Sequence, residues 1–152
     1  MVSIVLKNKG IQIPPRIVSV DYGTKRVGLS MADPLHLFAH PLDTCSPESS
    51  IEKLISLHKR DTIRVIVIGW PLNEDGTEGE ATRRVDRYIH QLCRRLPDVE
   101  IIRWDERYTS EEAKSRLAGR HGKKGRRSVD QVAACIILQE YLESISETTG
   151  LN

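Results

Sequence analysis

The chain has 152 residues, 39% of them hydrophobic and 29% charged, with a formal net charge of +2 at pH 7. This length suits one domain, which can bury enough surface to fold without disulfides or a structural metal. The composition excludes a disordered chain, and no stretch approaches the roughly 20 apolar residues of a membrane-spanning helix. The three cysteines are too few and too widely spaced for a disulfide framework or a zinc site, so we expect buried free thiols in a cytoplasmic protein.

Hydrophobic patterning predicts one domain over residues 16–143, preceded by a loose lead-in over 1–15 and followed by a fraying tail over 144–152. A strand over 17–20 closes on Asp21, and a strand over 27–31 returns beside it as a hairpin. A third short strand is expected at 37–42. Ser46-Pro47-Glu48 then starts a helix, because it offers an N-cap oxygen, a proline at the first helical position and an acid in the first turn.

The second half of the chain alternates strands and helices. We expect a strand over 63–68, a helix over 79–96, a strand over 99–104, a short helix over 111–117 and a last helix capped by Ser128. Strands joined through helices pair in parallel, whereas the opening hairpin is antiparallel. The fold class is therefore α/β, with a mixed sheet of five strands and helices on both faces.

Acidic residues stand at the ends of three of these apolar elements. Asp21 ends the first strand, Asp105 and Glu106 follow the strand over 99–104, and Asp130 lies in the first turn of the last helix. In open α/β sheets, ligands gather at the carboxyl ends of the strands. Asp130 is expected to face the sheet, because its neighbours three, four and seven residues on are Ala133, Ala134 and Ile137.

Each acid also has an ordinary structural explanation. Asp21 can initiate the turn before Gly23, Asp105 or Glu106 can pair with a neighbouring arginine, and Asp130 can complement the helix dipole. Their convergence favours a metal site, because unneutralised carboxylates in one place repel each other and lose hydration. Oxygen ligands without a histidine or cysteine cluster favour Mg²⁺ or Mn²⁺. Such ions can activate water for phosphodiester hydrolysis.

Four ordered motifs carry a resemblance to a known family. DYGTKRVGLS (21–30), GWPLNEDGTEG (69–79), WDERYTSEEA (104–113) and KKGRRSVDQVAACIIL (123–138) resemble the YqgF family, also called RuvX. That family is described as Holliday-junction-resolvase-like or as a pre-16S ribosomal RNA nuclease. The match runs in order from about Arg16 to Glu143, which makes it far more specific than any single motif.

The resemblance implies an RNase H-like fold, maturation of 16S rRNA and a cytoplasmic location. It maps the family's acidic positions onto Asp21, the pair Asp105 and Glu106, and Asp130. We expect Asp21, Glu106 and Asp130 to be catalytic and to bind metal. Asp105 is the second choice as a ligand after Glu106, because adjacent strand residues point to opposite faces. Trp70 departs from the family, which usually has a smaller aliphatic residue between the glycine and the proline.

Two further segments are candidate substrate contacts. Between residues 114 and 127, seven Lys or Arg residues occur without an acid, which favours a polyanion partner over a merely solvated face. The candidate phosphate-binding residues are Arg26, Arg107, Arg120, Lys123, Lys124, Arg126 and Arg127. The loop after the strand over 63–68 is either a substrate-facing loop or a simple connector, and its candidate residues are Gly69, Pro71, Asn73, Asp75 and Gly76. Trp70 can stack a base or belong to the core.

The function expected from these residues is a metal-dependent endonuclease that acts on structured RNA, with precursor 16S rRNA, alone or within the ribosomal particle, as the leading substrate. Branched DNA is the alternative substrate. Two rivals from other classes stay open: a non-catalytic RNA-binding module, and an actin-like phosphotransferase or ATPase suggested by the glycines of DYGTKRVG. The sequence leaves the choice between monomer and homodimer open.

Overall fold

The computed structural model describes residues 6–7, 10–11, 14–106 and 129–148, with side chains for 14–106 and 132–147. The main sheet has five strands in the order β5-β4-β3-β6-β7. They are β3 (Arg16–Asp21), β4 (Val27–Ala32), β5 (Ala39–Cys45), β6 (Ile63–Trp70) and β7 (Glu100–Asp105). β4 is antiparallel to both β3 and β5, while β3, β6 and β7 are parallel. The predicted mixed sheet is confirmed.

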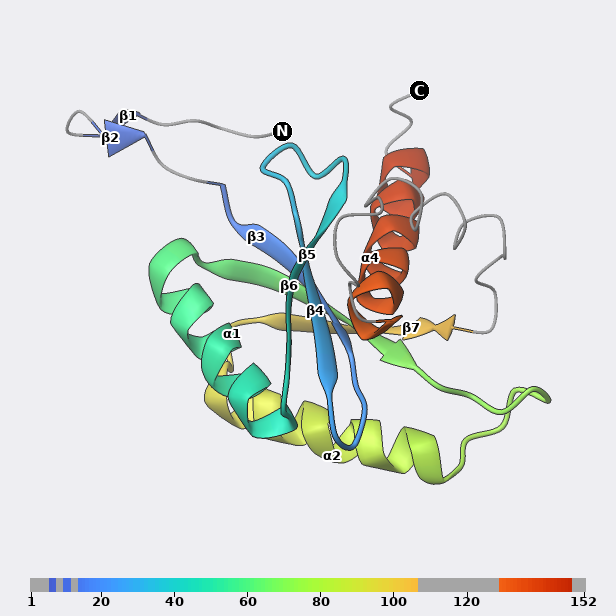
Figure 1. Cartoon of the computed structure of the whole chain (residues 1–152). Helices are drawn as coiled ribbons and strands as arrows, with labels where there is room; N and C mark the ends of the chain where they lie inside the picture. Colours follow the sequence, from blue (N-terminus) through green and yellow to red (C-terminus); the bar gives the residue numbers. More distant parts are fainter. Residues whose placement is uncertain (1–5, 8–9, 12–13, 107–128, 149–152) are drawn as a thin grey trace.

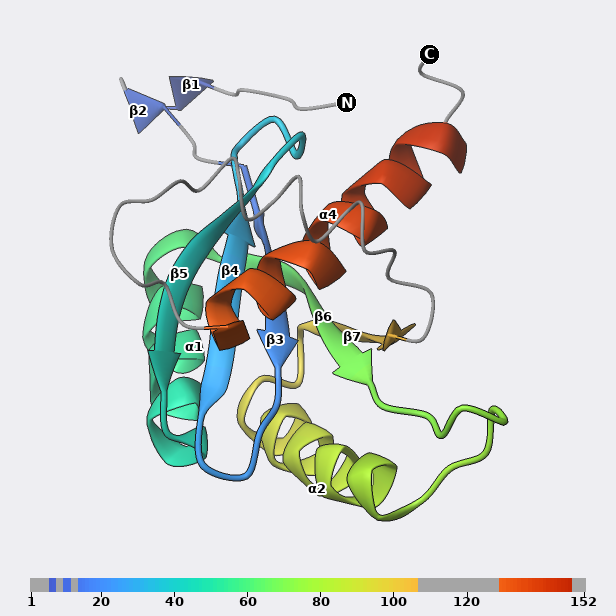
Figure 2. The ribbon, with the colours of Figure 1, turned by 45° about the vertical axis from the view of Figure 1, so that its right-hand side comes forward.

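Helices cover both faces of this sheet. α1 (Pro47–Asp61) and α2 (Glu80–Arg95) lie on one face, and α4 (Val129–Thr148) crosses the other (Figure 1). Figure 2, turned by 45°, shows α4 in front of β3 and β4. Strand alternation divides the apolar side chains accordingly. Val18 and Ile66 pack with α1 and α2, whereas Ile17 and Val67 pack with α4.

The start of α1 follows from its sequence. Ser46 is the N-cap, its side chain accepts a hydrogen bond from the Ser49 N–H at 3.2 Å, and Pro47 is the first helical residue. The apolar face then buries Ile51 and Leu54. This agrees with the predicted helix start, because all of its signals are local to the segment.

Other boundaries differ from the prediction. β5 begins at Ala39 rather than 37, because the Asp33 carboxylate accepts backbone hydrogen bonds from Leu35, Leu37 and Phe38 and holds them in a turn. α4 extends past Ser144 to Thr148, because Leu142 and Ile145 still pack against the sheet. Within the lead-in, β1 (Leu6–Lys7) and β2 (Gly10–Ile11) form a separate antiparallel pair.

The expectation that all three cysteines are buried free thiols is partly wrong. All three thiols are free, and Cys135 is buried, but Cys45 is half-buried and Cys93 is exposed. Cys93 lies next to the buried stripe of α2 rather than on it, so an apolar neighbourhood in sequence was a poor guide to its burial.

The short helix expected at 111–117 and the Ser128 cap fall outside the described residues. Among the helices that the structure describes, none is long and apolar enough to cross a membrane.

Candidate functional site

Two of the predicted acids meet at the carboxyl edge of the sheet. Asp21 ends β3 and Glu106 directly follows β7, and β6 lies between these two strands. Because these three strands are parallel, their carboxyl ends lie at the same edge. A side-chain hydrogen bond joins Glu106 to Asp21. Residues 85 positions apart in the chain therefore form one carboxyl pair.

Gly69 of β6 makes room for this pair. A Cβ atom at this position would lie 2.7 Å from Cδ of Glu106 and 2.9 Å from Cδ1 of Ile137, closer than real Cβ contacts. The backbone of β6 is therefore the surface on which the Glu106 carboxyl rests. Sequence analysis named Gly69 among the candidate residues of a loop that is either substrate-facing or a connector; in the structure it lies within β6, where its lack of a side chain leaves room for the Glu106 carboxyl.

Burial and negative neighbours act together on Glu106. Removal from water is the largest influence and raises the pKa of the Glu106 carboxyl above its usual value of 4.5. The hydrogen bond with Asp21 lowers this pKa, but the charges of Asp105 and Glu140 raise it further. Without a cation, the Glu106 carboxyl is therefore protonated more readily than a carboxyl in water. The protonated carboxyl can donate the hydrogen bond to Asp21.

This raised pKa predicts a pH-dependent stability. The folded state binds a proton more tightly than the unfolded state, so the stability that Glu106 contributes is present below pH 4.5 and is lost as pH rises through the folded pKa. Glu106→Gln removes this titration. In EDTA, denaturant unfolding at pH 4.5 and at neutral pH should show the variant gaining stability over wild type as pH rises. A relative gain by wild type would contradict the assigned environment.

Asp105 lies on the other side of the sheet edge. Arg103, two residues earlier on β7, donates to Asp86 of α2 at 2.6 Å and lies 4.1 Å over the Trp70 ring. Alternation along the strand therefore turns Arg103 and Asp105 toward α2, and turns Glu106 toward α4. Asp105 acts on Glu106 through its charge. This geometry favours Glu106 over Asp105 as the partner of Asp21.

α4 is fixed to the sheet by a buried polar contact. The hydroxyls of Ser19 on β3 and Ser30 on β4 contact each other, and each lies within donating distance of the carbonyl oxygen of Ala134, at 2.6 and 3.1 Å respectively. Both serines are fully buried. The contact lies one helical turn after Asp130, whose side chain is not among those that the structure describes. Sequence reasoning missed both serines, because a serine in an apolar strand gives no signal of its partner.

α4 also brings an acid that the sequence did not single out. Glu140 raises the pKa of Glu106 through its charge. It lies three residues after Ile137, which contacts the Gly69 position, so helical periodicity puts it on the same stripe. The sequence holds a signal for this acid, because the helical periodicity that runs from Asp130 to Ile137 leads on to Glu140. Among the side chains that the structure describes, no group of three or more acids, histidines or cysteines is arranged to hold a metal.

The loop after β6 is built from its own side chains. Asn73 donates from its side chain to Thr77 Oγ1 at 2.9 Å, the Asp75 carboxylate accepts from Thr77, and Gly76 has a φ of 86° that favours glycine. These are the turn contacts of a connector, and its role toward substrate stays a prediction. Trp70 is only 7% exposed and packs in the core. Of its two predicted roles, the core position agrees with the structure.

The predicted basic residues lie mostly outside the described residues. Arg26 is the exception, and it is exposed in the turn between β3 and β4. The others are Arg107, Arg120, Lys123, Lys124, Arg126 and Arg127. Their contact with phosphates stays a prediction.

Comparisons with known proteins agree on one family. A family model described as "RuvX: Holliday junction resolvase" matches residues 15–144. A protein of Salinibacter ruber named "Putative pre-16S rRNA nuclease" is 46% identical over 131 residues, which cover 84% of this chain and 92% of that protein. A protein of Chlorobium luteolum with the same name is 42% identical over 135 residues, which cover 84% and 94%.

Solved structures agree with the fold. Thermus thermophilus RuvC superposes with a TM-score of 0.64 at 11% identity, covering 89% of this chain and 96% of RuvC. The same protein in complex with a Holliday junction substrate gives a TM-score of 0.59 at 12% identity, with coverage of 90% and 96%. This likeness confirms the expected RNase H-like fold. With the family model covering almost the whole described domain, the chain belongs to the RuvX family.

Proposed function

We propose that this protein is a divalent-metal-dependent endonuclease that hydrolyses phosphodiester bonds in structured RNA, with precursor 16S rRNA in the cytoplasm as its substrate. The observation that carries the proposal is the hydrogen-bonded pair of Asp21 and Glu106 at the carboxyl edge of the sheet. The names of the family's relatives support RNA as the substrate class.

The residues of the site fit a divalent cation. Two contacting carboxyl groups need either a shared proton or a positive charge between them, and burial of Glu106 strengthens that need. The donor atoms are carboxylate oxygens, which suit Mg²⁺ or Mn²⁺. Asp21 and Glu106 would hold the ion, and Asp130 is the proposed third ligand. When bound, such an ion lowers the pKa of water and stabilises charge on the phosphate.

The remaining residues have positioning roles in this proposal. Gly69 lets Glu106 lie against β6, and the hydroxyls of Ser19 and Ser30 fix α4 one turn from Asp130. Arg26, on the β3–β4 turn that follows Asp21, would orient a phosphate through its planar guanidinium. The segment 120–127 would hold the RNA backbone by charge. Hydrolysis then joins the water oxygen to phosphorus as the bond to the leaving oxygen breaks; the water gives up one proton and the leaving oxygen takes one up.

Branched DNA is the second candidate substrate. It is favoured by the description of the matched family model, a Holliday junction resolvase. The catalytic carboxylates would have the same role with either nucleic acid. The choice between them therefore depends on the substrate-binding surfaces rather than on the metal site.

A cleavage assay separates the candidates. Purified protein with Mg²⁺ is incubated with end-labelled precursor 16S rRNA, with a four-way DNA junction and with ATP, and the products are resolved on gels. We expect discrete RNA fragments that are absent in EDTA. Preferential junction cleavage would support the second candidate, RNA binding without cleavage would support a binding module, and ATP turnover alone would support a phosphotransferase.

A further inference from the structure

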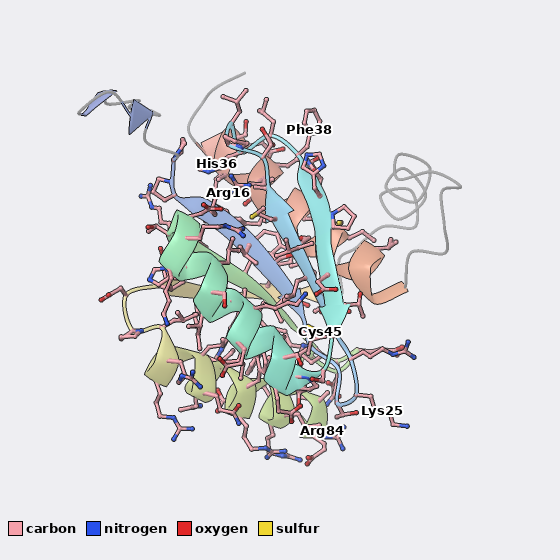
Figure 3. The ribbon with its side chains drawn as sticks, turned by 60° about the vertical axis from the view of Figure 1, so that its left-hand side comes forward. Arg16, Lys25, His36, Phe38, Cys45 and Arg84 are labelled. Atoms are coloured by element: carbon pink, nitrogen blue, oxygen red, sulfur yellow. The ribbon has the colours of Figure 1, made fainter. Side chains whose placement is uncertain are left out.

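A polar pocket of about 200 Å³ lies on the α2 side of the carboxyl edge, beside the β3–β4 turn. The pair of Asp21 and Glu106 faces α4, on the other side of the sheet, so this pocket is separate from the carboxyl pair. Figure 3 shows Lys25 of the turn and Arg84 of α2 at the same end of the molecule. Its lining includes Tyr22, Thr24, Glu48, Arg84, Arg87 and Tyr88.

The floor of the pocket is ordered by aromatic packing. The rings of Tyr22 and Tyr88 lie 5.0 Å apart, and the hydroxyl of the buried Tyr88 is 2.7 Å from Ser50 Oγ. The turn above it depends on Gly23, where a Cβ atom would lie 2.5 Å from the carbonyl oxygen of Arg26. The turn therefore presents Thr24 beside the pocket in a defined position.

The wall formed by α2 carries excess positive charge. Arg83, Arg84 and Arg87 share one carboxylate, Glu80, at distances of 3.1, 3.6 and 3.7 Å. These three guanidinium groups keep side-chain exposures of 63%, 47% and 66%. Lys25 and Arg26 add two exposed positive charges on the adjoining turn, against the single exposed Glu48 of the pocket lining. One shared carboxylate balances only one of these three charges, so the wall keeps a net positive charge.

Adjacent residues at the end of β3 link the carboxyl pair with the pocket. Tyr22 directly follows Asp21, and successive strand residues turn to opposite faces. A flexible nucleic-acid strand that crosses the end of β3 would therefore pass from the Asp21 carboxylate to the pocket, because Asp21 and Tyr22 are adjacent residues. A nucleic-acid backbone has the charge that matches this wall, and guanidinium groups bind phosphate oxygens through paired donors.

We propose that Arg84 and Arg87, with the Thr24 hydroxyl, bind the phosphodiester backbone of the nucleic-acid substrate on the α2 side of the carboxyl edge. This inference rests on the proposed function. The pocket gives the substrate a second point of attachment. This point lies on the α2 side of the sheet edge, whereas the carboxylates face α4. Arg84 and Arg87 are then binding residues that position the strand, with no part in the bond-breaking step.

The test compares two charge-matched double variants in an Asp21→Asn background, which prevents cleavage. Arg84→Gln/Arg87→Gln removes the pocket arginines. Arg94→Gln/Arg95→Gln removes two charges from the far end of the same helix, where Arg95 pairs with Glu52. Affinity for a fluorescein-labelled hairpin RNA with single-stranded flanks is measured by anisotropy over a salt series. Circular dichroism confirms that each variant is folded.

The pocket variant should bind more weakly and show a log–log salt slope reduced by about 1.4 for single-stranded contacts or about 1.8 for duplex contacts. The control variant should keep the slope of the background protein. Equal slopes for the pocket variant and the background, or equal losses for both double variants, would overturn the inference while leaving the proposed function intact. Failure of the background protein itself to bind RNA would overturn the proposed function and this inference together.

Discussion

Asp21→Asn, Glu106→Gln and Asp130→Asn should each lower the single-turnover rate of RNA cleavage in Mg²⁺ by about a hundredfold or more, while the affinity for RNA changes little. Even residues that only support a metal ligand cost about 10- to 100-fold when removed, so loss of a ligand should reach at least the upper end of that range. Each amide keeps the size of the side chain and removes the negative charge. The measurement is quenched-time gel analysis with enzyme in excess.

Asp105→Asn is the matched comparison for these variants, because it changes the same chemistry beside Glu106 on the α2-facing side of β7. It should lose much less activity. Near wild-type turnover for any of the first three variants would contradict that residue's assignment. For Asp130, full activity together with a lower melting temperature would identify an acid that only stabilises the start of α4, a contribution of about 0.3–1 kcal/mol.

Gly69→Ala should remove cleavage nearly as completely as Glu106→Gln, although the substitution adds a single methyl group. The new Cβ would occupy the place of the Glu106 carboxyl and come within 2.9 Å of Ile137 Cδ1. Displacing the carboxyl breaks the pair with Asp21. Crowding in a packed region also costs about 1–3 kcal/mol, which denaturant unfolding would measure.

A double-mutant cycle tests the cause of this loss. If Gly69→Ala acts through Glu106, its cost in unfolding free energy should be smaller in a Glu106→Ala background, where the carboxyl is gone. Gly79→Ala is the control, because its Cβ would lie 3.2 Å from Asn73 Nδ2 in a surface loop, away from the carboxyl pair. Retained activity in Gly69→Ala, or an equal cost in both backgrounds, would show that Glu106 does not depend on this glycine.

The fold was largely predictable because its signals are local. The β-branched run of β6 and the Ser46-Pro47 start of α1 each specify one element, and the order of elements then limits the topology. The boundaries that depend on distant contacts were not predictable. Asp33 delays the start of β5 by holding the preceding turn, and Ile145 packs on the sheet and prolongs α4.

The site was predictable in part, for a similar reason. Strand alternation already favoured Glu106 over Asp105, and the parallel order brought the end of β3 to the same edge as the end of β7. The role of Gly69 was hidden, because a strand-end glycine also suits a loop. Arg84 and Arg87 were hidden as well, because arginines on the outer face of a helix resemble ordinary solvated residues. Only the packing of α2 beside the β3–β4 turn gives them a pocket.

The central claim is that Asp21 and Glu106 form a binding site for a divalent cation. Calorimetric titration of Mn²⁺ or Mg²⁺ into metal-free protein, without nucleic acid, tests it most directly, with wild type, Asp21→Asn and Glu106→Gln compared at one pH. We predict saturable binding to wild type, accompanied by proton release from the carboxyl pair, and affinity at least about tenfold weaker in both variants. Equal affinity, stoichiometry and proton release in all three proteins would contradict the account.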